Sequence, residues 1–219
     1  MKPFFSVIVP AHNSAEYIGK CMRSIRKQTF RDFELIVVCD ACTDDTEEMA
    51  SVYTDKVIAT DFGMDGLARN AGIDAAEGEW ILFLDDDDWW IHEYVLQEIY
   101  DVVAGNFGEV FDMVCFDFIW KGRGYASVQP NNMNIAVWSK AFKRSLIGDT
   151  RFPAVQFTSD KPFMDEICKK RPMCYPMNKL MYYYNYMRKG SQTEEHARPE
   201  GAVPEACNNE KEGSAPDAG

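Results

Sequence analysis

The sequence lacks several features that would place it in a large class of proteins. It has no run of about eighteen apolar residues, so we expect no transmembrane helix. It contains neither a G-x-x-x-x-G-K-[ST] phosphate loop nor, after its first predicted strand, a G-x-G-x-x-G dinucleotide motif. Lys and Arg number 23 against 35 Asp and Glu, and the net charge of −12 argues against nucleic acid as a partner.

A long N-terminal apolar segment and a regular cysteine pattern are also missing. The apolar run at 4–9 is too short for a secretory signal peptide, and polar residues follow it at once. Seven scattered cysteines, an odd number, indicate reduced thiols in a cytosolic compartment. Cys39 and Cys42 have the spacing of a redox motif, but the acids between and after them favour a coincidental spacing.

What is present is a chain of 219 residues, 46% hydrophobic and 13% aromatic, which is enough for one domain with a sizeable core. Apolar, β-branched runs predict buried strands, and amphipathic segments between them predict helices. The strands are expected at 5–9, 33–39, 56–59 and 80–84, and the helices at 15–28, 44–53 and 66–76. This alternation predicts an α/β domain with a mostly parallel sheet covered on both faces.

The second half of the sequence predicts further helices and strands and then a tail. We expect helices at 92–103, 138–146 and 160–170, a strand at 111–118, a loop or hairpin at 121–134, and a strand or crossover at 181–187. Beyond residue 192 large apolar residues are almost absent, so the chain there cannot bury enough surface to offset its ordering entropy. Residues 194–219 are therefore expected to form a disordered acidic tail.

The buried run at 80–84 ends in four consecutive carboxylates, Asp85 to Asp88. Ligands of open α/β sheets bind beyond the carboxyl ends of the strands, so these aspartates should line a pocket. Four adjacent carboxylates repel one another, and Mg²⁺ or Mn²⁺ would relieve that repulsion. In an extended segment Asp85 and Asp87 would face one site, with Asp86 and Asp88 facing away. The alternative is a solvated turn in which Asp88 caps the next helix.

Other polar residues lie at the ends of the neighbouring predicted strands. Pro10 and His12 follow the first predicted strand, and Asp40 ends the second. Arg69 lies near the start of the helix that precedes the fourth strand. Asp40 suits either a hydrogen bond to a nucleotide base or a helix cap, and Arg69 suits either a phosphate or a surface ion pair. With the acidic stretch, these residues describe a site for a nucleotide diphosphate and a metal.

Four segments in this order resemble the signature of family 2 glycosyltransferases of the GT-A fold. They are residues 7–13, 40–46, 66–72 and 81–88, and the likeness continues at 138–144, 151–153 and 182–191. The resemblance covers nearly all of residues 4–193. It implies one GT-A domain at 1–193, with a nucleotide-sugar-binding half at 1–108 and an acceptor-side half at 109–193.

The resemblance implies a metal-dependent, hexosyltransferase-like enzyme that transfers a sugar, with inversion, from a nucleotide-diphosphate-sugar to a hydroxyl. A UDP-sugar donor, a glycan or lipid-linked acceptor and a role in polysaccharide or glycan assembly are expected. Asp160 matches the catalytic base, Trp138 is expected at the acceptor, and Asp85 and Asp87 match the ligands of Mn²⁺ or Mg²⁺. The residues assigned to the donor are Pro10, His12, Asp40, Arg69, Asp85 and Asp86.

Two departures from the family pattern keep other functions open. Ser159 stands where the family usually has Glu, and Cys39 to Cys42 replaces the usual Asp-Asp-Gly-Ser. A non-catalytic module that binds nucleotide-sugars or carbohydrates is therefore one alternative. A nucleotidyl transferase is another, although residues 10–16 contain no Lys or Arg to hold a triphosphate. We expect a cytoplasmic location, with peripheral association at the inner face of a membrane as an extension of the same analogy.

Overall fold

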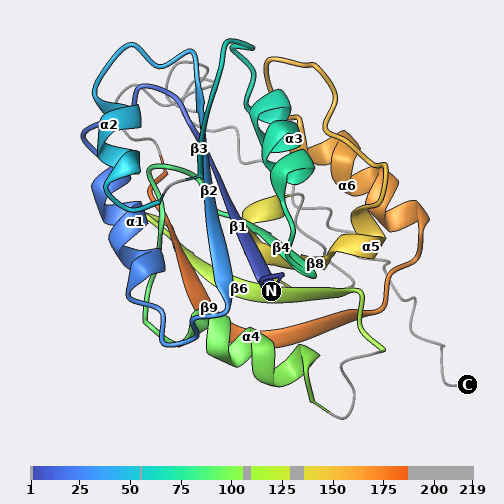
Figure 1. The fold of residues 1–219 in the computed structure, drawn as a ribbon. Coiled ribbons are helices and arrows are strands. Elements are labelled where there is room, and N and C mark those ends of the chain that lie inside the picture. The colour runs from blue at the N-terminus through green and yellow to red at the C-terminus, as the bar shows by residue number, and fades with distance from the viewer. Residues whose placement is uncertain (1, 55, 106–109, 129–135, 187–219) are drawn as a thin grey trace, which may run out of the picture.

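The computed structural model describes residues 2–54, 56–105, 110–128 and 136–186 (Figure 1). These residues form one sheet of nine strands in the order β3-β2-β1-β4-β8-β6-β9-β5, with β7 paired to β6 beside this path. The sheet runs through both halves proposed from the sequence. The proposed boundaries near 108 and 193 and the predicted tail lie outside the described residues.

The N-terminal half alternates strands and helices as predicted. Its elements are β1 (Phe5–Ala11), α1 (Ile18–Arg26), β2 (Phe33–Asp40), α2 (Thr46–Ser51), β3 (Lys56–Thr60), α3 (Asp65–Ala75) and β4 (Trp80–Phe83). β1 pairs in parallel with β2 and β4, and β2 pairs in parallel with β3. The carboxyl ends of these strands therefore meet at one edge of the sheet, where the chain carries its predicted site residues.

The elements that follow β4 make the sheet mixed. They are β5 (Trp89–Trp90), α4 (Val95–Val103), β6 (Met113–Trp120), β7 (Gly124–Ala126), η2 (Val137–Ser139), β8 (Lys140–Lys143), α5 (Arg144–Ile147), α6 (Asp160–Lys169) and β9 (Cys174–Tyr184). β8 lies antiparallel between β4 and β6, whereas β9 runs parallel to β6. The α/β class is confirmed. The predicted mostly parallel arrangement holds in the N-terminal half, whereas the complete sheet is mixed.

The helix predicted at 138–146 is wrong. The segment forms η2, the strand β8 and the single turn α5. Ala141 and Phe142 are completely buried, and Phe142 pairs with Ile81 on one side and with Met113 on the other. A short strand buried on both faces is apolar without alternation, so its sequence resembles that of a buried helix. The pairing partners decided the conformation.

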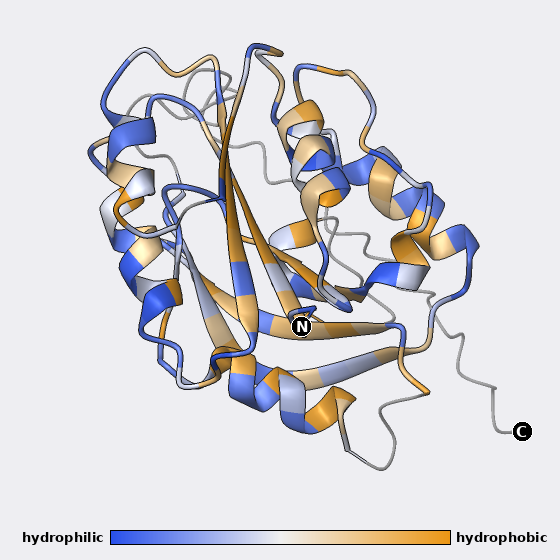
Figure 2. Ribbon diagram, in the orientation of Figure 1, coloured by the Kyte–Doolittle hydropathy of each residue, from blue (hydrophilic) through white to orange (hydrophobic). Residues whose placement is uncertain are grey.

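The helices cover the sheet with their apolar faces and present polar faces to solvent (Figure 2). None of the helices in the described ranges is both long and apolar enough to cross a bilayer. The contact between α3 and β1 is especially close. A Cβ atom added to Gly72 would lie 2.3 Å from Cγ2 of Ile8, which is completely buried. This close approach fixes α3, and with it Arg69, against the strand next to β4.

Candidate active site

Side chains from α3, the end of β4 and the start of α6 converge on the Arg69 guanidinium. Nη2 of Arg69 donates a hydrogen bond to Oδ1 of Asp85 at 2.8 Å. Nη1 pairs with the carboxylate of Asp65, one turn earlier in α3, and lies 3.8 Å from Oδ1 of Asp160. The Arg69 side chain is 5% exposed. The structure thus brings together the predicted residues Arg69, Asp85 and Asp160, and adds Asp65.

This cluster holds three carboxylates around one guanidinium. Burial and the excess of negative charge together change the pKa values of Arg69 and Asp160. Burial by itself would lower the pKa of Arg69, but the charges of Asp160, Asp85 and Asp65 raise it. Burial raises the pKa of Asp160 to about 6, with Arg69 opposing this shift and Asp85 adding to it. Asp160 is therefore largely ionised at neutral pH and accepts a proton more readily than an ordinary aspartate.

Asp160 is held at the first turn of α6 by contacts to two other segments. The backbone N–H of Val137 donates to Oδ2 of Asp160 at 3.2 Å. The preceding residue, Ser159, is 1% exposed, and its Oγ donates to Oδ2 of Asp65 at 3.1 Å. The serine that departs from the family pattern therefore binds the same carboxylate that pairs with Arg69.

The acidic stretch folds as a turn instead of the extended segment expected from the sequence. The N–H of Asp88 donates to the carbonyl of Asp85 at 3.1 Å. Asp86 is buried and accepts a hydrogen bond from the backbone N–H of His12 at 3.0 Å. Asp85 faces Arg69, and the side chain of Asp87 is partly exposed. The exposure of the four aspartates still alternates as predicted, with Asp86 and Asp88 buried and the other two partly exposed. A common site for Asp85 and Asp87 stays a prediction.

Asp88 is completely buried and does not cap α4, whose N-cap is Tyr94. Its carboxylate accepts hydrogen bonds from the Tyr182 hydroxyl at 2.6 Å and from the Asn185 N–H at 2.7 Å. Burial, followed by the charges of Asp87 and Asp85, raises the pKa of Asp88 well above its usual range. Tyr182 lies 94 positions from Asp88, so no local pattern in the sequence connects the two residues.

The residues predicted around the nucleotide base lie together at the ends of β1 and β2. Pro10 is paired with Val38, and Nδ1 of the exposed His12 lies 2.6 Å from the Asp40 carbonyl oxygen. The Asp40 carboxylate accepts hydrogen bonds from Thr60 Oγ1 at 2.9 Å, from the Phe62 N–H at 2.6 Å and from the Met64 N–H at 2.9 Å. Asp40 thus organises the loop that leads into α3, and its contact to a base stays a prediction.

Trp138 is 6% exposed and belongs to an aromatic cluster. Its ring stacks on Tyr182 with centroids 4.5 Å apart and meets Phe118 edge-on at 4.7 Å. This packing supports the tyrosine that binds Asp88. The acceptor contact of Trp138 stays a prediction, and the burial of its ring gives that contact no support.

The sequence predicts a divalent metal ion at the acidic turn. In the portions of the chain that the structure describes, no group of three or more His, Cys, Asp or Glu residues is arranged to hold a metal ion. Mg²⁺ and Mn²⁺, however, commonly take only one or two protein carboxylates, and substrate phosphates and water supply the other ligands. Asp85, whose Oδ1 accepts a hydrogen bond from Arg69, and the partly exposed Asp87 are the two carboxylates expected to supply such oxygens, and the metal site stays a prediction.

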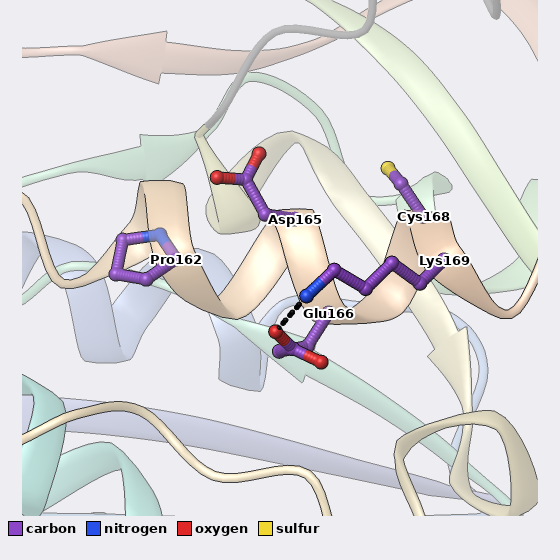
Figure 3. A pocket seen from close by; sticks show the side chains of 5 residues that line it. All are labelled: Pro162, Asp165, Glu166, Cys168 and Lys169. Carbon is purple, nitrogen blue, oxygen red and sulfur yellow. Dashed lines mark hydrogen bonds and ion pairs between the residues drawn. The ribbon is translucent and has the colours of Figure 1, made fainter.

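A shallow hollow on α6 lies outside this cluster (Figure 3). It is lined by Pro162, Asp165, Glu166, Cys168 and Lys169, and Nζ of Lys169 lies 2.5 Å from Oε1 of Glu166. Most of these residues are exposed, and all come from one helix. Because none of them belongs to the Arg69 cluster, the candidate site is defined by the cluster and not by this hollow.

Solved structures share the fold of the chain. Staphylococcus aureus TarS 1–349 in complex with UDP-GlcNAc gives a TM-score of 0.75 at 27% identity, covering 89% of this chain and 61% of that one. The mannosyltransferase PcManGT from Pyrobaculum calidifontis, in complex with GDP-Man and Mn²⁺, gives a TM-score of 0.69 at 19% identity, covering 87% and 59%. These similarities confirm the expected GT-A type architecture.

Curated relatives are longer than this chain. Glycosyltransferase GlyA of Streptococcus pneumoniae is 28% identical over an alignment 218 residues long, and this alignment covers 85% of this chain and 31% of GlyA. The PGL/p-HBAD biosynthesis glycosyltransferase of Mycobacterium bovis is 40% identical over 130 residues, which cover 56% and 50%. The family model described as Glycosyl transferase family 2 matches residues 6–166, a range that contains Arg69, Asp85 and Asp160. The chain therefore belongs to glycosyl transferase family 2.

Proposed function

We propose that this chain is a glycosyltransferase domain that transfers a sugar, with inversion, from a nucleotide-diphosphate-sugar to an acceptor hydroxyl. The observation that carries the proposal is the position of Asp160, a partly buried carboxylate with a raised pKa, 3.8 Å from Arg69 and beside the acidic turn. The UDP-GlcNAc complex of the similar TarS supports a UDP-sugar as the donor. A glycan or lipid-linked acceptor, glycan assembly and association with a membrane face belong to the same proposal.

The proposed chemistry is a single displacement. Asp160 takes the proton of the acceptor hydroxyl as the hydroxyl oxygen forms a bond to the anomeric carbon. The bond between that carbon and the diphosphate oxygen breaks, and the nucleoside diphosphate leaves with the electron pair. Because attack and departure take place on opposite faces, the anomeric configuration inverts. Arg69, which its carboxylate neighbours keep protonated, supplies a fixed positive charge beside the donor.

Other predicted site residues near the Arg69 cluster have proposed roles in holding the donor. Asp85 and Asp87 would hold Mn²⁺ or Mg²⁺, which supplies positive charge that stabilises the departing diphosphate. Asp86 fastens the acidic turn to the loop after β1 through the N–H of His12. His12 and Asp40, which lie side by side, are proposed to contact the base.

The test is the release of UDP from UDP-GlcNAc by the purified protein with and without Mn²⁺, followed by the same assay with other nucleoside-diphosphate sugars. We expect release that requires the metal and falls by roughly 10²–10⁴-fold in Asp160→Asn, the range for loss of a general base. Asp165→Asn is the matched control, because Asp165 pairs with Lys161 on the solvent face of the same helix. Nucleotide binding without any turnover would favour the non-catalytic module.

A further inference from the structure

Asp65 lies between the guanidinium of Arg69 and the start of α6. Its carboxylate pairs with Nη1 of Arg69, and its Oδ2 also accepts a hydrogen bond from Ser159 Oγ at 3.1 Å. Nη2 of Arg69 is hydrogen-bonded to Asp85 at 2.8 Å. Both terminal nitrogens of Arg69 are therefore engaged by carboxylates other than Asp160.

The distance from Arg69 to Asp160 is consequently too long for a hydrogen bond. Nη1 lies 3.8 Å from Oδ1 of Asp160, whereas a charge-assisted N–H···O bond measures about 2.7–2.9 Å. A direct bond from Arg69 would stabilise the ionised form of Asp160 and make it a weaker proton acceptor. The observed spacing leaves the carboxylate attracted to Arg69 without being hydrogen-bonded to it.

The helix starts that carry these residues touch each other. A Cβ atom added to Gly66 would lie 3.0 Å from Cβ of Phe152 and 3.0 Å from Cβ of Ser159. α3 and α6 are accordingly neighbours (Figure 1). At this close approach a small displacement of the Arg69 side chain would bring Nη1 within hydrogen-bond distance of Asp160, and the pairing with Asp65 opposes that displacement.

We propose that Asp65 is a positioning residue that holds Arg69 back from Asp160 and fastens Ser159 at the start of α6. The proposal rests on the proposed function, because it takes Asp160 as the base. Asp65 itself touches neither the proposed base nor, in this role, the substrate; it acts through Arg69 and Ser159. Replacing its charge while keeping its shape should let Arg69 pair with Asp160.

The first test is a crystal structure of Asp65→Asn, which keeps the side-chain shape and removes the charge. We expect Nη1 of Arg69 to move to within about 3.2 Å of an Asp160 oxygen, the usual limit for an N–H···O bond. An Arg69 side chain that stays in place overturns the proposal. This measurement needs no turnover, so it decides the role of Asp65 even if the wild-type protein releases no UDP, an outcome that would count against the proposed function alone.

The second test is kinetic and uses the release of UDP from UDP-GlcNAc in the presence of Mn²⁺. We expect Asp65→Asn to lower kcat by tenfold or more while KM for UDP-GlcNAc changes less than twofold, and Asp65→Glu to recover most of kcat. In an Arg69→Met background, Asp65→Asn should change kcat less than twofold, because the guanidinium that it restrains is gone and the Asn amide oxygen can still accept the hydrogen bond from Ser159. Losses that multiply in the double variant contradict the proposal. Asp74→Asn is the control. Asp74 lies on α3, as Asp65 does, but its exposed carboxylate pairs with Arg151 and not with Arg69.

Discussion

Asp160 combines a proposed catalytic role with a cost to stability. Its pKa is about 6 in the folded protein, against about 3.9 in an unfolded chain. The folded state therefore binds this proton more tightly, so the stability that Asp160 contributes is present below pH 4 and is lost as pH rises through 6. The difference of about two pKa units corresponds to at most about 3 kcal/mol.

We predict that Asp160→Asn is more stable than the wild type by roughly 1–3 kcal/mol at pH 8. The uncharged amide cannot ionise, so the gain should shrink toward zero at pH 4. Urea unfolding at pH 4, 6 and 8 measures the free energy of unfolding of both proteins. A gain that is equal at the three pH values would show that the ionisation of Asp160 is not its cause.

Tyr182 is the partner of the buried Asp88, and its hydroxyl also accepts a hydrogen bond from the Asp85 N–H at 3.3 Å. Tyr182→Phe leaves a buried carboxylate without its side-chain donor, and we predict a loss of about 1–3 kcal/mol in the free energy of unfolding. Tyr183→Phe is the matched control, because its ring keeps the stacking on Trp89. Equal effects of the two changes in urea unfolding would mean that the hydroxyl of Tyr182 has no special role.

At the level of elements, the position of α3 on β1 depends on Gly72. Because an added Cβ would lie 2.3 Å from Cγ2 of Ile8, Gly72→Ala must displace the helix, distort the strand or force the Ile8 side chain out of its packed position. We predict a destabilisation of about 1–3 kcal/mol, typical of overpacking a core, together with reduced UDP release because Arg69 moves with the helix.

Gly19→Ala is the control for this change. Gly19 lies in α1, and the nearest atom to its added Cβ is Nη1 of Arg23 at 3.2 Å, the end of a flexible side chain. Alanine favours a helix over glycine by about 1 kcal/mol, so Gly19→Ala should leave the protein unchanged or more stable. Thermal unfolding of both variants compares them, and a Gly72→Ala protein as stable as Gly19→Ala would contradict the close packing of α3.

For the molecule as a whole, binding of donor and metal should appear as added stability. A ligand at 100 times its Kd stabilises the native state by about 2.7 kcal/mol, which raises Tm by roughly 5–10 °C in a chain of this size. We predict a larger rise with UDP and Mn²⁺ together than with UDP alone, and we predict that Asp87→Ala abolishes the part that depends on Mn²⁺.

Asp101→Ala, which removes an exposed carboxylate bonded to Gln97 on α4, should leave the response to Mn²⁺ intact. Differential scanning fluorimetry with UDP, GDP and their sugars, each with and without Mn²⁺, measures these shifts. A shift that depends on Mn²⁺ and persists in Asp87→Ala would place the metal on other residues.

Sequence patterns were sufficient to predict the α/β class, the parallel N-terminal half and the edge of the sheet at which His12, Asp40 and Asp85 lie. These follow from short-range periodicity and from the rule that parallel strands end on the same side. The helix at 138–146 was mispredicted because the strand that replaced it is defined by its neighbours β4 and β6.

The hydrogen-bond and ion-pair partners of the acidic residues, in contrast, depend on contacts between elements that are distant in the sequence. The tertiary structure made the Asp85 to Asp88 stretch a turn, buried Asp88 against Tyr182 and set Asp65 between Arg69 and Ser159. The hydrogen bonds of Asp88 to Tyr182 and of Asp65 to Ser159 each join residues 94 positions apart. Local sequence patterns carry no information at that range, because such contacts depend on where packed elements place their ends.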